Sequence, residues 1–574
     1  MKILRKEQTN MIKVQEFHKD YKRWAWQIND NISYAEDIVL FKLDAKNTSY
    51  VFGATDDGYL IHAYYGKKIE DEDLTYLLRL TENPWTLKTN ARDKGTFMDA
   101  HAFEYPCHGT GDYREPCLMV MDDEGMTTTD LRYVSHKVYK GKPALEGMPA
   151  TFANENEAET LEITCVDKHT GLEAVLVYTA FNDLDVITRS VRLKNNGTAP
   201  LNVKRVLSAC VDFDNDGYDF ITLNGSWARE RVMERCRLHH GKQGVDSVKG
   251  ESSHQNNPFV ALVSHTADED NGEAYGFNFV YSGNFFAQAE VTQHKYTRLV
   301  MGINHFDFNW LLEAGEEFVA PEVVMVYSSE GIGAMSRTFH DLYREHLIRG
   351  EYKDKRRPIL INNWEATYFN FDTDKLIDIA KQASKLGIEM LVMDDGWFGH
   401  RDSDNSSLGD WFVYESKIKG GLKYLVDEVN KLGMKFGIWF EPEMISPDSE
   451  LYKKHPEWAI QVQGRELTMS REQYVLDYSN KEVRDCIYDM MKKILDSANI
   501  EYIKWDMNRQ LTEVGSTTLP ADRQRELWHR YVLGVYDIMN RLTTDYPYIL
   551  LENCSGGGAR FDAGMLYFSP QIWT

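Results

Sequence analysis

The chain has few cysteines and no long apolar run. Its seven cysteines among 574 residues form no CxxC pair. A disulfide framework and a zinc site are therefore both disfavoured, and we expect reduced thiols inside a cell. The opening residues, MKILRKEQTNM, lack the apolar stretch of about 7–15 residues that a secretory signal needs. No other run approaches the roughly 18 apolar residues of a membrane span. These absences predict a cytoplasmic protein with no membrane partner.

Excess positive charge and nucleotide-binding glycine motifs are also missing. The 65 Lys and Arg residues are outnumbered by 89 Asp and Glu residues, which gives a formal net charge of −24. This charge disfavours nucleic acids and anionic membranes as partners, because both are polyanionic. No GxGxxG or GxxxxGKS/T motif follows an expected strand, so a nucleotide-binding open sheet loses support. An uncharged small molecule fits this composition better.

The first part of the chain has the pattern of an antiparallel β-sandwich. Apolar and polar residues alternate over short segments separated by turn residues, as in YVFGATDDGYLIHAYYG (50–66) and LEAVLVYTAF (172–181). Period-two alternation is typical of strands with one buried face. We therefore expect a sandwich domain over 1–330, followed by a helical linker over 331–355 that joins it to a second domain.

Residues 356–574 repeat a strand, a loop and a helix. Two of the helical segments end at Gly387 and Gly433, a common helix stop. Repeated βα units predict a parallel sheet, and acidic or aromatic residues follow nearly every strand. A (β/α)8 barrel gathers such strand ends around one mouth, so we favour a barrel over an open sheet. Only six strands can be counted, so we expect an incomplete barrel.

The strand end YIKWDMNRQ (502–510) carries opposite charges. Lys504 and Asp506 are two residues apart and therefore share one face of the strand. An ammonium beside a carboxylate keeps the carboxylate ionised, which suits a nucleophile or an electrostatic stabiliser. A structural ion pair would produce the same pattern.

Other strand ends allow more than one interpretation. Asp394 and Asp395 precede Gly396, a pattern found in sugar sites, in metal sites and in ordinary turns. The segment Glu441-Pro442-Glu443 is expected to be structural. The CSGGG loop (554–558) either lets a ligand approach the backbone closely or is a flexible turn. Arg471 would most simply be a solvated or ion-paired surface residue.

Several long segments together resemble the α-galactosidases of glycoside hydrolase family 36. The similarity runs over nearly the whole chain. It is carried by INNWEATYF (361–369), VMDDGWFGHRD (392–402), GIWFEPEMISPDSELYKKHPEW (437–458), YIKWDMNR (502–509) and ENCSGGGARFDAGMLYFSPQIWT (552–574), with TDLRYVSHKVYKGKP (129–143) and NGSWARERV (224–232) upstream.

This resemblance implies a site and a mechanism. The family's catalytic nucleophile falls on Asp506, and hydrolysis of terminal α-D-galactose from melibiose- or raffinose-type oligosaccharides would proceed with retention. The family needs no metal or organic cofactor, is typically homotetrameric, and adds a small C-terminal β-domain. Its sugar-binding residues fall on Trp364, Asp394, Asp395, Trp439, Arg471, Lys504, Asn508, Cys554 and Gly557, with Trp227 bordering the pocket.

One element of the family pattern is missing from this sequence. Retaining enzymes need a second carboxyl about 5–5.5 Å from the first. In the family it is an aspartate just after the Trp-Thr of the sixth strand, where this sequence reaches Trp573-Thr574. We therefore expect a truncated sequence whose acid/base aspartate, last two barrel strands and C-terminal domain lie beyond Thr574. Asp562 is expected instead to cap a helix or to pair with Arg560.

Three alternatives remain open. The enzyme could be an α-N-acetylgalactosaminidase, although Cys554 and Gly557 resemble the galactose-specific pattern with room for a 2-hydroxyl. The truncated chain could be a non-catalytic galactoside-binding fragment. A metal-dependent isomerase or lyase could use Asp394, Asp395, Glu441 and Asp506 as oxygen ligands.

Overall fold

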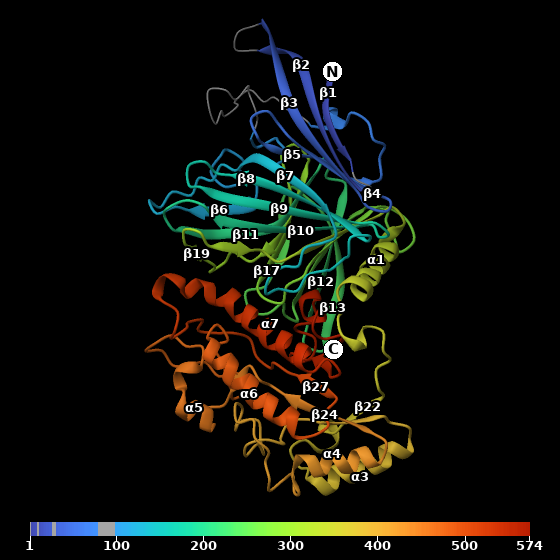
Figure 1. Ribbon diagram of the computed structural model, residues 1–574, viewed down its shortest axis with the longest axis vertical. Helices are drawn as coiled ribbons and strands as arrows, with labels where there is room; N and C mark the ends of the chain where they lie inside the picture. Colours follow the sequence, from blue (N-terminus) through green and yellow to red (C-terminus); the bar gives the residue numbers. More distant parts are fainter. Residues whose placement is uncertain (1, 9–10, 26–29, 79–97, 574) are drawn as a thin grey trace.

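The computed structural model describes residues 2–8, 11–25, 30–78 and 98–573. It divides into an antiparallel half, blue to green in Figure 1, and a parallel α/β half, yellow to red, below it. This confirms the predicted fold class of an antiparallel sandwich followed by a partial barrel. Within the described residues, no helix is both long and apolar enough to cross a membrane.

The chain begins with a five-stranded antiparallel meander that the sequence pattern did not separate from the sandwich. Its strands pair in sequence order, and every residue of the fourth strand is buried because the meander packs on the next sheet. The strands are β1 Lys2–Gln8, β2 Ile12–Ala25, β3 Asp30–Asp44, β4 Thr48–Ala54 and β5 Leu60–Lys67. A short 3-10 helix, η1 Leu74–Leu77, follows them.

Two further antiparallel sheets share one apolar core. The ten-stranded sheet contains β7 Arg132–Lys140, β8 Ala158–Val166, β9 Leu172–Phe181, β10 Val186–Asn195, β12 Tyr218–Ser226, β13 Arg229–Arg237, β15 Asn256–Ser264, β16 Ala274–Phe279, β20 Glu317–Val319 and β21 Val323–Ser328. The six-stranded sheet contains β6 Leu118–Met121, β11 Leu201–Phe213, β14 Gly241–Asp246, β17 Phe285–Val291, β18 Thr297–Ile303 and β19 Trp310–Leu312.

A helix connects the two halves. Helix α1 Gly331–His346 packs against β16 and β21 through Met335 and Phe339, which lie over Gly276. A 3-10 turn, η2 Glu351–Lys353, leads to the first parallel strand. The boundaries of the three predicted domains remain predictions, although the change from antiparallel to parallel pairing falls across this connection.

The second half is built on a six-stranded parallel sheet whose strands pair in chain order, and all six predicted strands are present. The register aligns their carboxyl ends, since Trp439 lies beside Lys504 and Lys504 beside Glu552. The strands are β22 Leu360–Asn362, β23 Met390–Met393, β24 Lys435–Phe440, β27 Tyr502–Trp505, β28 Leu550–Asn553 and β29 Gln571–Ile572. A small antiparallel pair, β25 Met444–Ile445 and β26 Tyr474–Val475, lies outside this sheet.

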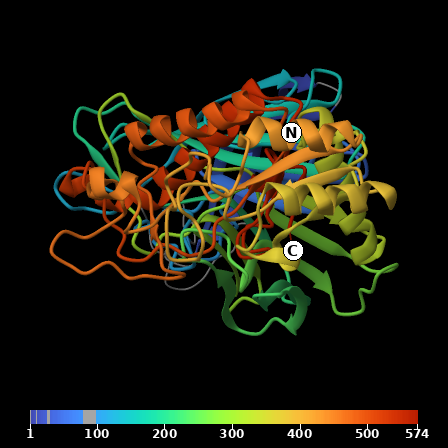
Figure 2. The same cartoon turned by 90° about the horizontal axis from the view of Figure 1, so that it is seen from below.

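Amphipathic helices bury one face against this sheet. Asp372 caps the helix that ends before Gly387, and Gly387 and Gly433 both adopt positive φ just after their helices, as predicted. Figure 2, a view from below, shows long orange and red helices of this half along its upper edge. The helices are α2 Trp364–Thr367, α3 Thr373–Lys385, α4 Gly421–Lys431, α5 Glu450–Lys454, α6 Lys481–Ser497, α7 Leu527–Asp545 and α8 Ala563–Leu566, with 3-10 turns η3 Pro456–Trp458 and η4 Ala521–Glu526.

The two halves are joined by buried polar contacts as well as apolar ones. Tyr281, after β16, lies with its hydroxyl 2.9 Å from Nδ1 of His529 on α7. The Tyr536 hydroxyl accepts a hydrogen bond from the Ser282 amide at 2.8 Å. Burial lowers the pKa of His529 to about 3, so its imidazole is neutral in this interface. The sandwich therefore forms a fixed wall against the parallel half.

Candidate active site

The carboxyl ends of the parallel strands gather most of the predicted site residues. Asp506 follows β27 directly, and the Asp394–Asp395 pair follows β23. Trp439 lies within β24, one residue before its end, and Cys554 follows β28. Because these strands are parallel and in register, their carboxyl ends lie at one edge, the location of active sites in barrels.

Asp506 is a buried carboxylate that the surrounding groups keep ionised. Its Oδ2 accepts a hydrogen bond from the Trp439 indole Nε1 at 3.1 Å, and its Oδ1 accepts one from the Met507 amide at 3.0 Å. Burial by itself raises the pKa of Asp506. The charge of Lys504, with hydrogen bonds from Asn508, Cys554 and Trp439, outweighs burial and brings that pKa below its usual value.

Lys504 makes its ion pair with a different carboxylate from the one its sequence position indicated. Its Nζ lies 3.0 Å from Oδ2 of Asp394 and 4.5 Å from the centre of the Trp573 ring. Burial lowers the pKa of Lys504, but Asp394 and then Asp506 raise it more, so the ammonium stays charged. The structure therefore contains no isolated ion pair between Lys504 and Asp506. One lysine acts on two carboxylates from neighbouring strands.

The other member of the aspartate pair is held by an arginine. Arg401 donates from Nε and Nη2 to the two oxygens of Asp395 at 2.9 and 2.8 Å, a two-pronged contact. Asp395 raises the pKa of Arg401 against the opposing effect of burial. Asn363 places the pair by accepting the Asp394 amide hydrogen at 2.8 Å. The backbone of this aspartate pair is thus held by a hydrogen bond, and the side chain of Asp395 is held by an ion pair.

Glu441 is a buried acid beside the site whose importance the sequence did not reveal. Its Oε1 accepts hydrogen bonds from the Asn508 amide and from Gln473 Nε2, both at 2.7 Å. Burial, with the negative charge of Asp506, raises the pKa of Glu441 to about 8. At neutral pH Asp506 is therefore ionised while Glu441 is largely protonated. The available signal was its position directly after β24.

The sandwich holds the two loops that follow β27 and β28. Glu251, 1% exposed, accepts a hydrogen bond from Gln510 at 3.0 Å and one from the Ser555 hydroxyl at 2.9 Å. His254 Nε2 lies 2.9 Å from the Gly556 carbonyl oxygen, and Glu230 accepts the Gly558 amide hydrogen at 3.1 Å. Sequence reasoning missed Glu251, because its partners are distant in the chain.

The glycine loop (554–558) is an ordered turn with a defined backbone conformation. Gly556 and Gly557 have φ of +51° and +92°, a conformation that favours glycine. The Cys554 amide donates to the Trp505 carbonyl at 2.7 Å, and the Cys554 thiol bonds to Asp506. Burial raises the pKa of that thiol, so it remains a neutral donor. All seven cysteines of the chain are free thiols.

Three predicted residues lie at the edge of this cluster. Trp364 begins α2 and packs edge-on against Tyr368 and Phe369. Arg471 is exposed, has φ of +51° and lies 3.6 Å from Asp404, while its charge also acts on Glu441. Trp227 is 72% exposed at the turn between β12 and β13. The structure joins neither Arg471 nor Trp227 to Asp506 by a direct contact among the described residues.

The remaining acids near the strand ends are structural. Glu443 accepts hydrogen bonds from Trp505 at 2.7 Å and from both terminal nitrogens of Arg560. Asp562 caps α8 by accepting the Met565 amide hydrogen, as one prediction stated. The alternative pairing of Asp562 with Arg560 is wrong as an ion pair, since Arg560 pairs with Glu443. The bonds of Glu443 show one way in which the segment 441–443 supports the structure.

The described residues contain no group of three or more His, Cys, Asp or Glu side chains arranged to hold a metal ion. Asp394 is bound to Lys504, and Asp395 to Arg401. Their oxygens are thus directed at protein cations. The predicted acid/base position after Thr574, and Thr574 itself, lie outside the described residues.

A β-sandwich leading into a parallel barrel sheet, with an ionised carboxylate among indole, amide and ammonium groups at its strand ends, defines the class of barrel glycoside hydrolases. The family model Melibiase matches residues 317–574, and the model of the glycosyl hydrolase family 36 N-terminal domain matches residues 58–313. The chain belongs to glycoside hydrolase family 36, a family of α-galactosidases.

Individual relatives agree with this assignment. The chain is 51% identical over 545 residues to α-galactosidase AgaA of Geobacillus stearothermophilus, covering 95% of this chain and 75% of the relative. It is 46% identical to α-galactosidase Mel36A of Lactobacillus acidophilus, covering 95% and 74%. The crystal structure of AgaA superposes with a TM-score of 0.92 at 52% identity, covering 93% of this chain and 75% of that one. Substituted forms of AgaA are known in complex with raffinose and with stachyose.

Proposed function

We propose that this α-galactosidase releases terminal non-reducing α-D-galactose from oligosaccharides such as melibiose and raffinose, with retention of configuration and a covalent galactosyl-enzyme on Asp506. The observation that carries the proposal is the charge state of Asp506. It is buried, yet Lys504, Asn508, Cys554 and Trp439 bring its pKa below the usual value. A carboxylate that is both desolvated and ionised is suited to attack at an anomeric carbon. The raffinose and stachyose complexes of a relative support the substrate class.

The steps follow from that carboxylate. Asp506 attacks C1 of the galactose, a C1–O bond to Asp506 forms, and the bond from C1 to the leaving oxygen breaks. A second carboxyl gives its proton to that oxygen. It later takes a proton from a water whose oxygen bonds to C1, while the C1–O bond to Asp506 breaks and frees the carboxylate. We place this second carboxyl on the aspartate expected to follow Thr574. Glu441 and Asp506 are neighbouring acids, and the raised pKa of Glu441 leaves Asp506 as the anion of the two. The two acids therefore have different roles.

The neighbouring groups bind the sugar in this proposal. Asp394 and Asp395 are anchored by Lys504 and Arg401, so their remaining lone pairs can accept galactose hydroxyl hydrogens. Trp439 and Trp364 offer apolar ring surface to the C–H face of the ring. Cys554, small and neutral, leaves space beside Asp506 for a 2-hydroxyl.

The decisive experiment traps the intermediate. A 2-deoxy-2-fluoro-α-galactosyl fluoride should label the protein once, on the peptide containing Asp506, and NMR should show α-galactose as the first product. The variant Asp506→Asn should lower kcat at least about 10⁴-fold without unfolding, because the nucleophile is lost but the shape is kept. Asp402→Asn, which changes an exposed carboxylate paired with Lys417, is the matched control and should keep its activity. A label on another residue, or β-galactose as the first product, would exclude the proposal.

Substrate choice is tested separately. Release of p-nitrophenol from the α-galactoside should greatly exceed release from the α-N-acetylgalactosaminide. Faster release from the latter would assign the chain to the other specificity. Tight galactose binding with no turnover and no label would identify a binding fragment.

Assembly and location complete the proposal. We expect a cytoplasmic homotetramer, on the family resemblance and on seven free thiols that suit a reducing compartment. Light scattering on the purified protein gives the mass of the assembly directly.

A further inference from the structure

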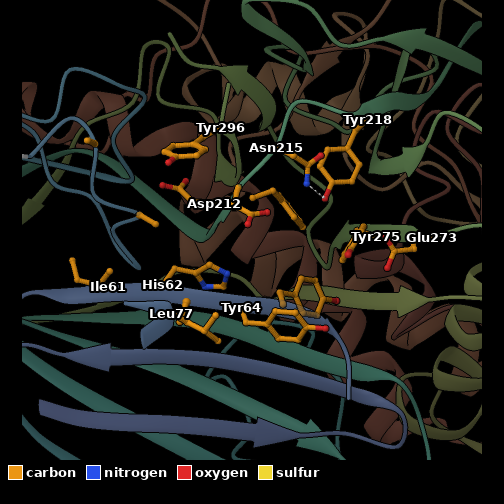
Figure 3. A pocket seen from close by; sticks show the side chains of 16 residues that line it. Ile61, His62, Tyr64, Leu77, Asp212, Asn215, Tyr218, Glu273, Tyr275 and Tyr296 are labelled. Carbon is orange, nitrogen blue, oxygen red and sulfur yellow. Dashed lines mark hydrogen bonds between the residues drawn. The ribbon is translucent and has the colours of Figure 1, made fainter. Parts of the chain in front are cut away.

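A cavity of about 290 Å³ lies in the antiparallel half, away from the parallel strand ends. It is formed where β5 of the meander meets the ends of β11, β12 and β16 from the two larger sheets. Figure 3 shows His62 and Tyr64 on one side, with Asp212, Asn215 and Tyr296 opposite. Small-molecule sites often lie where domains or layers meet and begin at about 300 Å³.

The polar groups of the wall offer hydrogen-bonding atoms to a ligand. Glu104 is ionised, because the nearby Arg189 brings its pKa below normal despite burial. Its carboxylate lies 3.1 Å from Nδ1 of His62, and this contact orients the imidazole ring in the wall. Asn215 donates to the Tyr218 oxygen at 3.0 Å, so the Tyr218 hydroxyl can still donate. Tyr65, only 5% exposed, lines the cavity, and its hydroxyl has no hydrogen-bond partner among the described residues.

The charges of the cavity argue against an ionic ligand. None of the 16 lining residues is a lysine or an arginine, so an anion would find no counter-charge there. The carboxylate of Asp212 is already held by Arg298 from behind, at 2.8 and 2.9 Å, and by Arg114. Glu273 is exposed and accepts the Tyr327 hydroxyl hydrogen at 2.8 Å. Asp214, the third carboxylate of the wall, is also exposed, so a cation would meet only carboxylates that are screened by solvent or already paired.

Aromatic rings form much of the rest of the wall. Tyr275 packs edge-on against Phe213 and Tyr218, with ring centres 4.9 and 5.9 Å apart, which fixes that side of the cavity. Tyr64 and Tyr296 are half-buried, so part of each ring faces outward. Aromatic surface combined with hydrogen-bond donors and acceptors, in a wall that holds no Lys or Arg, matches a pyranose or furanose ring. We propose that this cavity binds one neutral monosaccharide-sized sugar unit, separately from the barrel mouth.

The proposal is tested by ligand-observed NMR titrations of the protein with galactose, glucose and fructose. At least one sugar should show a binding event that Tyr296→Ala weakens about fivefold or more, since the variant removes ring surface from the wall. Trp364→Ala, at the other site, should leave that event unchanged. Tyr113→Ala, which removes an exposed ring outside the cavity, is the matched control and should also leave it unchanged.

One further variant guards the test against the wrong ligand class, and a folding measurement guards it against misfolding. Glu273→Gln retains an oxygen acceptor and should keep sugar binding within twofold, while thermal unfolding verifies that each variant is folded. If folded Tyr296→Ala keeps every sugar-binding event of the wild-type protein, the proposal is overturned. Binding of tetramethylammonium that Glu273→Gln abolishes, with no sugar bound, would overturn it in favour of a cation site. Neither outcome depends on Asp506, so failure here leaves the proposed hydrolysis untouched.

Discussion

Buried charges are arranged differently in the sandwich and at the barrel strand ends. In the sandwich Arg298 lies 2.9 and 2.8 Å from Asp112 and Asp212, and Arg114 pairs with the same two carboxylates. Arg189 lies 3.0 Å from Glu104. These residues are nearly inaccessible, and their cations and carboxylates satisfy one another. At the barrel mouth one ammonium, Lys504, acts on two carboxylates. Buried ionisable groups are thus structural where each charge is balanced by an opposite charge beside it. They are available for chemistry where one cation must serve two carboxylates.

The largest expected effect concerns the buried ion pairs of the sandwich. Arg298→Met leaves Asp112 and Asp212 buried with Arg114 as their remaining cation, so one buried carboxylate loses its counter-charge. The free energy of unfolding should fall by about 3–5 kcal/mol. The protein that remains folded should retain its kcat. Chemical denaturation and active-site titration measure the two quantities. Arg235→Met removes a more exposed pair with Asp219 and should cost less than about 1 kcal/mol. Equal losses in the two variants would contradict the comparison.

Removing a charge from the barrel strand ends should change the activity of the enzyme. Lys504→Met removes the largest influence that lowers the pKa of Asp506. That pKa should rise, so the acidic limb of the kcat/KM profile should move to higher pH and the plateau should fall about 10²–10³-fold.

The control for this change is another buried barrel lysine. Lys417→Met breaks a pair with Asp402 and bonds to two carbonyl groups. It should reduce stability without moving the acidic limb. An unmoved limb in Lys504→Met would show that the lysine is only structural.

A smaller effect is expected where the sandwich supports the site. Glu251 accepts from Gln510 and Ser555 with different oxygens, so Glu251→Gln loses one acceptor and should misalign one loop. We expect kcat/KM to fall about tenfold, with most of the change in kcat. Glu230→Gln keeps an acceptor for the Gly558 amide and should change kcat/KM less. A change in Tm alone, with normal kinetics, would limit Glu251 to a structural role.

The last effect is a dependence of stability on pH that comes from Glu441. Its pKa is raised to about 8 in the folded protein, so between its unfolded pKa and pH 8 the folded state holds the proton more tightly. Stability should therefore be fully present below the unfolded pKa and fall as pH rises towards 8, by at most about 1.4 kcal/mol per pH unit. Glu441→Gln should flatten this slope in urea unfolding at pH 5, 6.5 and 8. A wild-type slope in the variant would assign the pH dependence elsewhere.

Much of the fold could be predicted from local pattern. The six parallel strands, the helix ends at Gly387 and Gly433 and the position of Asp506 after β27 were all visible, because periodicity and turn residues are local signals. The separate five-stranded meander was not, because its strands alternate like those of the sandwich. Glu251 was missed, and Glu441 was named only as a structural residue or a metal ligand, because the partners that bury these acids are distant in the chain.

The sequence by itself determined which segments form strands and helices and which charged residues stand at strand ends. It also determined the family, since long motifs are shared with relatives across both halves. Only the tertiary structure decided which charges meet. Lys504 and Asp394 are 110 positions apart, and Glu251 and Ser555 are 304 apart. Periodicity carries no information about such distant pairs, because they are set by strand register and by the packing of the two halves.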